Sequence, residues 1–324
     1  MEENTEQRLD LTLFSERIQE LKERIASVVV GQEQTVDLVL TAVLANGHVL
    51  IEGVPGVAKT LLARLTARLI DADFSRIQFT PDLMPSDVLG TTVFNMKTNG
   101  FDFHQGPIFA DIVLVDEINR APAKTQAALF EVMEERQVSI DGTTHRMGEL
   151  YTILATQNPV EQEGTYKLPE AQLDRFLMKI TMDYPSLEEE VNILERHHTN
   201  AALVKLDDIV PAITKEELLS LRAFMNQVFV DRTLLQYIAL IVQQTRTSKA
   251  VYLGASPRAS VAMLQSSKAY ALLQGRDFVT PEDIKFVAPY VLQHRLILTA
   301  EAEMEGYSPV KVTQRLIDKV EVPK

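Results

Sequence analysis

Residues 53–60 read Gly53-Val54-Pro55-Gly56-Val57-Ala58-Lys59-Thr60. The stretch follows the apolar run 48–51 and precedes a segment in which leucines recur every three or four residues, as is typical of a helix. A strand, a glycine-rich turn and a Lys-Thr pair that opens a helix are the layout of a phosphate-binding loop, because backbone N–H groups there can surround phosphate oxygens. In that arrangement Lys59 reaches the β- and γ-phosphates of a nucleotide, and Thr60 ligates Mg²⁺.

One residue of this loop departs from the strict pattern, which has glycine before the lysine. The residue at that position is Ala58. A residue with a Cβ atom favours negative φ, so we expect a negative φ at Ala58 and a methyl group beside the phosphates. The significance of the loop therefore depends on the rest of the chain.

Composition limits the class of protein. The chain has 324 residues, of which 46% are hydrophobic, enough for one large or two medium domains. It has no apolar run as long as a membrane span, and its acidic N-terminus does not resemble a signal peptide. The lack of cysteine excludes disulfides and thiolate metal sites and fits a cytoplasmic protein. A net charge of −13 argues against a broad nucleic-acid-binding face.

The chain divides into three parts. Residues 1–30 are expected to form an N-terminal helix. Residues 31–185 alternate helical patterns with apolar runs at 48–51, 76–79, 112–115, 152–155 and 178–180. Continuous β-branched runs suit strands buried on both faces, so this part is predicted to be an α/β domain with a parallel sheet covered by helices. In residues 186–324 strand-like runs become scarce and helix caps such as Thr214 with Glu217 appear, which predicts a smaller all-α domain.

Two segments of the α/β part have the pattern of insertions. Residues 91–108 contain Asn99-Gly100, and residues 137–150 contain Asp141-Gly142; both dipeptides favour the tight turn of a hairpin. The first segment carries Phe94, Phe101 and Phe103. These aromatic side chains fit equally a surface that contacts a partner and a set of packing residues.

The apolar run 112–115 ends in Asp116-Glu117. Ligands of α/β sheets lie at the carboxyl ends of the strands, so both acids are expected beside the phosphate loop. There Asp116 would bind Mg²⁺ through its waters, and Glu117 would polarise the water that attacks the γ-phosphate. The six histidines show no spacing with acids that is typical of a metal site.

The chain resembles the MoxR family of AAA+ ATPases. The resemblance rests on the segments 53–60, 115–122, 124–129, 133–138, 155–159, 173–176 and 254–259. It implies the phosphate-loop NTPase fold, followed by a helical lid domain. It also implies hydrolysis of Mg²⁺-ATP, a homo-oligomeric ring that is usually a hexamer, and remodelling or maturation of partner proteins. Such partners often contain von Willebrand factor A domains.

The resemblance also implies roles for single residues. Asn158 matches the family's sensor 1, and its amide can hydrogen-bond both the γ-phosphate and the attacking water. Arg175 matches the arginine finger, which reaches the γ-phosphate of the neighbouring subunit. Arg258 matches sensor 2 and would tie the lid to the phosphates of its own subunit, in cis. The nucleotide-binding set then comprises Gly31, Gln32, Val54, Pro55, Gly56, Val57, Ala58, Lys59, Thr60, Leu61 and Asp116. Arg120 and Arg136 also fall in the family motif, without an assigned role.

Three functions are compatible with this pattern. The first is a protein-remodelling ATPase, and the second is a nucleotide-gated assembly scaffold with weak turnover. The third is a DNA-dependent motor. The presence of Glu117, Asn158 and Arg175 favours turnover over a scaffold. The charge of −13 and the lack of a DNA-binding module count against a motor on DNA.

Overall fold

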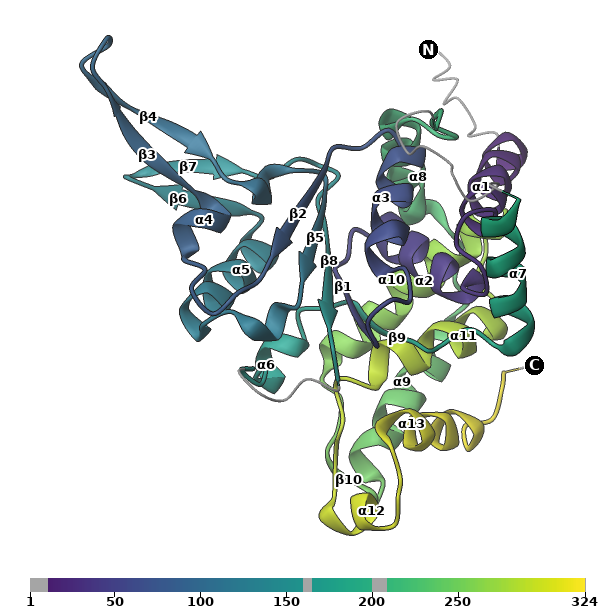
Figure 1. The fold of residues 1–324 in the computed structure, drawn as a ribbon. Helices are drawn as coiled ribbons and strands as arrows, with labels where there is room; N and C mark the ends of the chain where they lie inside the picture. Colours follow the sequence, from purple (N-terminus) through teal and green to yellow (C-terminus); the bar gives the residue numbers. More distant parts are fainter. Residues whose placement is uncertain (1–10, 160–164, 200–208, 324) are drawn as a thin grey trace, which may run out of the picture.

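The computed structural model describes residues 11–159, 165–199 and 209–323 (Figure 1). Its centre is a five-stranded sheet of order β2-β5-β8-β1-β9, in which every neighbouring pair is parallel. The strands are β1 (Val49–Gly53), β2 (Phe74–Gln78), β5 (Ile112–Asp116), β8 (Thr152–Gln157) and β9 (Met178–Met182). This confirms the predicted α/β fold with a parallel sheet.

Helices bury both faces of the sheet. Val49 and Leu114 lie in one hydrophobic core, and Leu50 and Val113 lie in the other, because successive side chains of a strand point to opposite faces. The first face packs against α1 (Leu11–Ala26), α2 (Glu33–Leu44) and α3 (Lys59–Leu69), and the second against α4 (Pro85–Leu89) and α5 (Ala123–Glu135) (Figure 1). The predicted N-terminal helix is α1, which buries Ile18 against the first core.

The chain after β9 is mostly helical. Its helices are α7 (Leu187–His198), α8 (Lys215–Phe224), α9 (Arg232–Thr247), α10 (Pro257–Leu273), α11 (Pro281–Leu292), α12 (Ala300–Met304) and α13 (Pro309–Asp318), with the short strands β10 (Val251–Leu253) and β11 (Ile297–Leu298). The short helix α6 (Glu170–Leu173) lies before β9. Thr214 and Glu217 form the predicted capping box of α8. In the part of the chain that the structure describes, no helix is long and apolar enough to span a membrane.

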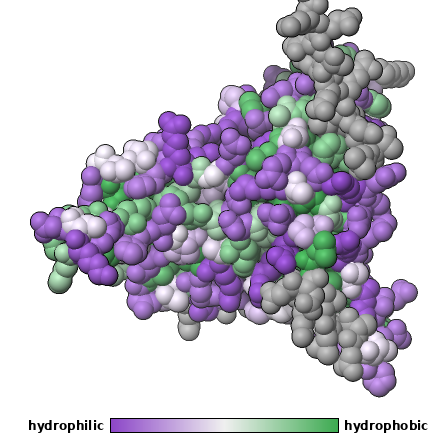
Figure 2. Space-filling view, turned by 90° about the horizontal axis from the view of Figure 1, so that it is seen from above, coloured by the Kyte–Doolittle hydropathy of each residue, from purple (hydrophilic) through white to green (hydrophobic). Residues whose placement is uncertain are grey.

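Both predicted hairpins are present. β3 (Gly90–Asn95) pairs with β4 (Gly100–Gln105), and β6 (Gln137–Ile140) pairs with β7 (Thr143–Arg146). They extend from the α5 side of the sheet, and apolar side chains lie at the tip of this projection (Figures 1 and 2). Phe94 and Phe101 pack edge to face 5.3 Å apart, yet Phe101 remains 73% exposed. Phe103 instead packs against Phe109 and His145.

A buried arginine joins the helical part to the sheet. Arg295 follows α11, and its side chain is 3% exposed. Its guanidinium donates to the Asp174 carboxylate at 2.6 Å, to the Phe176 carbonyl at 2.7 Å and to the Leu177 carbonyl at 3.1 Å. Burial lowers the pKa of Arg295, and the Asp174 carboxylate opposes that shift. These bonds satisfy a buried charge and fix α11 to the loop that leads into β9.

We predict that Arg295→Met lowers the free energy of unfolding by about 3 kcal/mol, because four backbone carbonyls and the Asp174 carboxylate lose their donor. Urea unfolding followed by circular dichroism measures this loss. The matched control is Arg64→Met, since Arg64 is exposed on α3 and its replacement should change stability by about 0.5 kcal/mol or less. Equal effects of the two substitutions would contradict the assigned role of Arg295.

Candidate active site

The loop between β1 and α3 has a strained conformation. Ala58 caps α3 with φ 62° and ψ 23°, in the left-handed region. The expectation of a negative φ at Ala58 is therefore wrong. A tight strand-to-helix connection imposes a conformation that glycine adopts freely and that costs a residue with a Cβ atom about 1–2 kcal/mol. Gly56 also has a positive φ, 89°, and no heavy atom would lie within 4 Å of a Cβ atom there.

Lys59 folds back over this loop. Its ammonium group donates to the carbonyls of Gly53 and Val54, the latter at 2.9 Å. Burial lowers the pKa of Lys59, while the carboxylates of Asp116 and Glu117 raise it. The ammonium group of Lys59 therefore lies at the loop and bonds to two neutral carbonyls. A charged phosphate oxygen is a stronger acceptor and can replace them.

The loop, the two acids and Asn158 line one cavity, here called the phosphate pocket. Its volume is about 410 Å³, and its lining comprises Pro55, Gly56, Val57, Ala58, Lys59, Thr60, Leu61, Asp116, Glu117, Thr156 and Asn158. The ends of β1, β5 and β8 carry these residues, because the carboxyl ends of parallel strands lie at one edge. Three of the residues predicted to bind nucleotide lie elsewhere. Gly31 packs against Glu189: a Cβ atom built on Gly31 would lie only 2.4 Å from the Glu189 carboxylate. Gln32 and Val54 lie outside the lining.

The two acids of the phosphate pocket are held in place by neighbours on adjacent strands. The Thr156 hydroxyl donates to Asp116 Oδ1 at 2.6 Å and accepts the Glu117 backbone N–H at 3.0 Å. Arg76 of β2 donates to Asp116 Oδ2 at 2.7 Å. Gln78, at the end of β2, donates to Glu117 Oε2 at 2.9 Å. Glu117 itself has φ 57°, so the turn after β5 projects its carboxylate away from the line of the strand.

Arg76, Gln78 and Thr156 were not identified as functional from the sequence. Arg76 and Gln78 lie in the predicted run 76–79 and Thr156 directly follows the run 152–155, but their proximity to the acids depends on the strand order. β2 and β8 flank β5, with Gln78 directly opposite Asp116. A prediction that placed β2 and β8 beside β5 would have found them.

The chemistry of the phosphate pocket fits Mg²⁺. Thr60 supplies a hydroxyl oxygen and Asp116 a carboxylate oxygen, and Mg²⁺ binds few protein oxygens when substrate phosphates and water complete its coordination. Within residues 11–159, 165–199 and 209–323, no group of three or more His, Cys, Asp and Glu side chains is arranged to hold a metal. His48 and His294 are buried, and burial lowers the pKa of His48 to about 3.

A second cavity contains the two predicted arginines. This arginine pocket has a volume of about 460 Å³, and Arg136, Arg175, Arg258, Arg295, Glu134 and Asp174 are among its lining residues. Arg175 lies 3.7 Å from Glu134, and Arg258 also pairs with Glu134. Neither arginine lines the phosphate pocket. Arg258 lies instead at the start of α10, where its guanidinium pairs with Glu134 of α5 and lies 3.8 Å from the Asp174 carboxylate.

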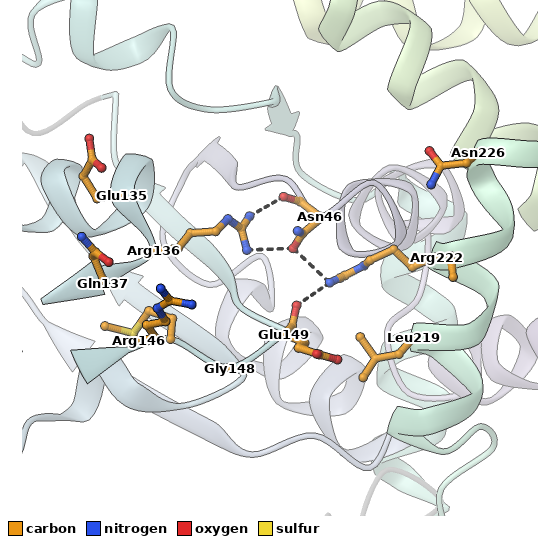
Figure 3. A pocket seen from close by; sticks show the side chains of 12 residues that line it. Asn46, Glu135, Arg136, Gln137, Arg146, Gly148, Glu149, Leu219, Arg222 and Asn226 are labelled. Carbon is orange, nitrogen blue, oxygen red and sulfur yellow. Dashed lines mark hydrogen bonds between the residues drawn. The ribbon is translucent and has the colours of Figure 1, made fainter. Parts of the chain in front are cut away.

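The two unassigned arginines of the motif have different environments. Arg120 pairs with the Glu117 carboxylate at 3.1 Å. Arg136 has φ 50° and follows α5; its guanidinium donates to the side chain and backbone oxygens of Asn46 (Figure 3). Arg136 therefore fixes the end of α5 against the turn that follows α2.

Comparison with known proteins identifies the family to which the chain belongs. Residues 48–178 match the model of the ATPase family associated with various cellular activities, and residues 243–318 match the AAA lid domain. The chain is 48% identical to the uncharacterized protein YeaC of Bacillus subtilis over 93% of both chains. It is 44% identical to the chaperone MoxR1 of Mycobacterium tuberculosis, over 93% of this chain and 81% of that one.

A solved structure agrees with these relatives. The crystal structure of a candidate ATPase from Cytophaga hutchinsonii superposes with a TM-score of 0.88 at 41% identity, over 97% of each chain. Identity at this level over nearly the whole chain, together with the matched ATPase and lid models, shows the family as well as the fold. The chain belongs to the MoxR family of AAA ATPases.

Proposed function

We propose that this protein hydrolyses Mg²⁺-ATP at the interfaces of a homo-oligomeric ring, most simply a hexamer. The observation that carries the proposal is the separation of two complementary half-sites on one subunit. The phosphate pocket holds the loop, Asp116, Glu117 and Asn158. The arginine pocket holds Arg175 and Arg258. A second copy that brings its phosphate pocket against the arginine pocket would complete the site.

Each residue of the phosphate pocket has a task in this proposal. The loop and the start of α3 surround the phosphates, and Lys59 exchanges its carbonyl acceptors for phosphate oxygens. Thr60 and Asp116 would hold Mg²⁺, which would supply positive charge to offset that of the phosphates. Glu117, oriented by Gln78, polarises the attacking water, and Asn158 holds that water by its amide.

The arginines act on the neighbour's nucleotide. Arg175 stabilises the charge that develops on the γ-phosphate, as an arginine finger supplied in trans. Because Arg258 lies in the same pocket, we assign it to the neighbour's nucleotide as well, in place of the cis contact implied by the resemblance. Hydrolysis would then release two charge contacts between subunits and allow them to rotate against each other.

The work done by this cycle is proposed to be remodelling or maturation of a partner protein. The relative named a chaperone supports this assignment. A partner with a von Willebrand factor A domain is the candidate class, and the projecting hairpins with exposed Phe94 and Phe101 are the candidate contact surface.

A weakly hydrolysing scaffold is less well supported, because Gln78 and Thr156 hold Glu117 in a position suited to turnover.

Lys59→Ala is expected to weaken nucleotide binding roughly 10- to 150-fold, since hydrogen bonds between charged groups contribute about 1.5–3 kcal/mol. Isothermal titration calorimetry with ADP measures this. Lys249→Ala, at an exposed position before β10, is the matched control and should bind normally. Unchanged affinity of the Lys59 variant would remove the proposed nucleotide site.

Glu117→Gln is expected to keep nucleotide affinity and to lower kcat about 10²- to 10⁴-fold, the usual contribution of a positioned general base. Release of inorganic phosphate under saturating ATP measures turnover, and calorimetry measures binding. Glu131→Gln, exposed on α5, should retain full turnover. Undiminished hydrolysis by the Glu117 variant would disprove its role.

Arg175→Ala and Arg258→Ala are each expected to bind ATP normally and to hydrolyse it slowly. Mixing either protein with the Glu117→Gln protein should restore part of the activity, because some interfaces then combine an intact Glu117 with an intact arginine. Phosphate release from mixtures of varied ratio measures the recovery. If Arg258 acts in cis, its mixtures will show no recovery while those of Arg175 do.

A further inference from the structure

The arginine pocket is a positive region in an acidic protein. Four arginines and two carboxylates are among its lining residues, whereas the whole chain has a net charge of −13. His48, which also lines the pocket, is buried, and burial lowers its pKa to about 3, so it adds no charge at neutral pH. The pocket therefore suits a polyanion. Its own two carboxylates, Glu134 and Asp174, partly balance the charge of the arginines.

The two carboxylates are held very differently. Asp174 accepts from Arg295 at 2.6 Å, and Arg295 is 3% exposed and bonded to two further carbonyls. Asp174 is thus a permanent part of the fold. Glu134 has no comparable anchor: among the described residues, its ion pairs within 4 Å are those with Arg175, at 3.7 Å, and with Arg258.

The backbone under Glu134 is nevertheless fixed. Glu134 lies in the last turn of α5, two residues before Arg136. Arg136 donates to Asn46 Oδ1 at 2.8 Å, and Arg222 of α8 donates to the same oxygen at 3.0 Å (Figure 3). Arg222 also donates to the Glu149 carbonyl at 2.6 Å. This cluster ties α5, α8 and the end of α2 together, so the movable part of Glu134 is its side chain.

The pairs that Glu134 forms are easily exchanged. The side chains of Glu134, Arg175 and Arg258 are 36%, 31% and 52% exposed, and water competes strongly with ion pairs at such exposure. A γ-phosphate offers more charge than one carboxylate and three acceptor oxygens, and arginine binds it through two parallel bonds. Both arginines can therefore pass from Glu134 to a phosphate.

We propose that the Glu134 carboxylate occupies, in the free subunit, the place that the neighbour's γ-phosphate takes in the ring. It pairs with the guanidinium groups of Arg175 and Arg258 until the interface closes, and the phosphate then displaces it. This inference rests on the proposed function. Glu134 also competes with the incoming phosphate, so it sets the ATP and protein concentrations at which the ring closes.

Glu134→Gln tests this competition, because the amide keeps the size of the side chain and removes its charge. The matched control is Glu135→Gln, the next residue of α5, which is exposed and does not line the arginine pocket. Assembly is measured by analytical ultracentrifugation in ATP, with both substitutions placed in the Glu117→Gln background so that ATP persists. KM and kcat are measured with Glu117 intact, and thermal unfolding verifies the fold of each variant.

Glu134→Gln is expected to lower the protein concentration for half-assembly and the KM for ATP, each about 3- to 10-fold, with kcat within about two-fold of the parent protein. Glu135→Gln should match the parent in all three values. A Glu134→Gln protein that assembles like the control, or that loses kcat without a change in KM, overturns the inference.

Failure of this inference is distinguishable from failure of the proposed function. Recovery of activity in mixtures of the Arg175→Ala and Glu117→Gln proteins supports the shared site whatever Glu134→Gln does. If Arg175→Ala and Arg258→Ala proteins hydrolyse ATP at the parent rate, the shared site is wrong, and the role of Glu134 is overturned with it.

Discussion

A parallel sheet whose two faces are covered by helices has one edge at which its loops can meet a ligand, and this constraint arranges the whole subunit. The strands β1, β5 and β8 end at that edge, and they deliver the phosphate loop, Asp116 with Glu117, and Asn158 to one cavity. The Thr156 hydroxyl then sets the geometry inside it, since one oxygen bonds both to Asp116 and to the backbone of Glu117. The chemistry thus depends on the strand order, which places β8 and β2 on either side of β5.

Charge divides the subunit into two unlike surfaces. In the phosphate pocket two carboxylates outnumber one lysine, and Arg76 partly neutralises Asp116. In the arginine pocket the excess charge is positive. Two surfaces of opposite sign on one chain favour head-to-tail contact between identical copies, and such a contact closes into a ring when the rotation allows.

Local patterns predicted most of this arrangement, and long-range geometry accounts for what they missed. The strands, both hairpins and the Thr214 cap follow from periodicity and turn chemistry, which act within a few residues. The sign of φ at Ala58 could not be deduced, because a whole-loop constraint overrides the preference of a single residue. Arg76 and Gln78 reach the acids only through the pairing of β2 with β5. The position of Arg258 beside Glu134 depends on how the helical part packs against α5. The residues around Arg258 in the sequence do not reveal that packing.

The buried bond between Arg295 and Asp174 has a mechanical consequence. Asp174 precedes Arg175 in the chain, while Arg295 follows α11 in the helical part. The bond therefore links the segment that carries Arg175 to the helical part that carries Arg258. In the proposed ring, this link would make Arg175 and Arg258 move together, so a change at one nucleotide would reach both charge contacts with the neighbouring subunit at once.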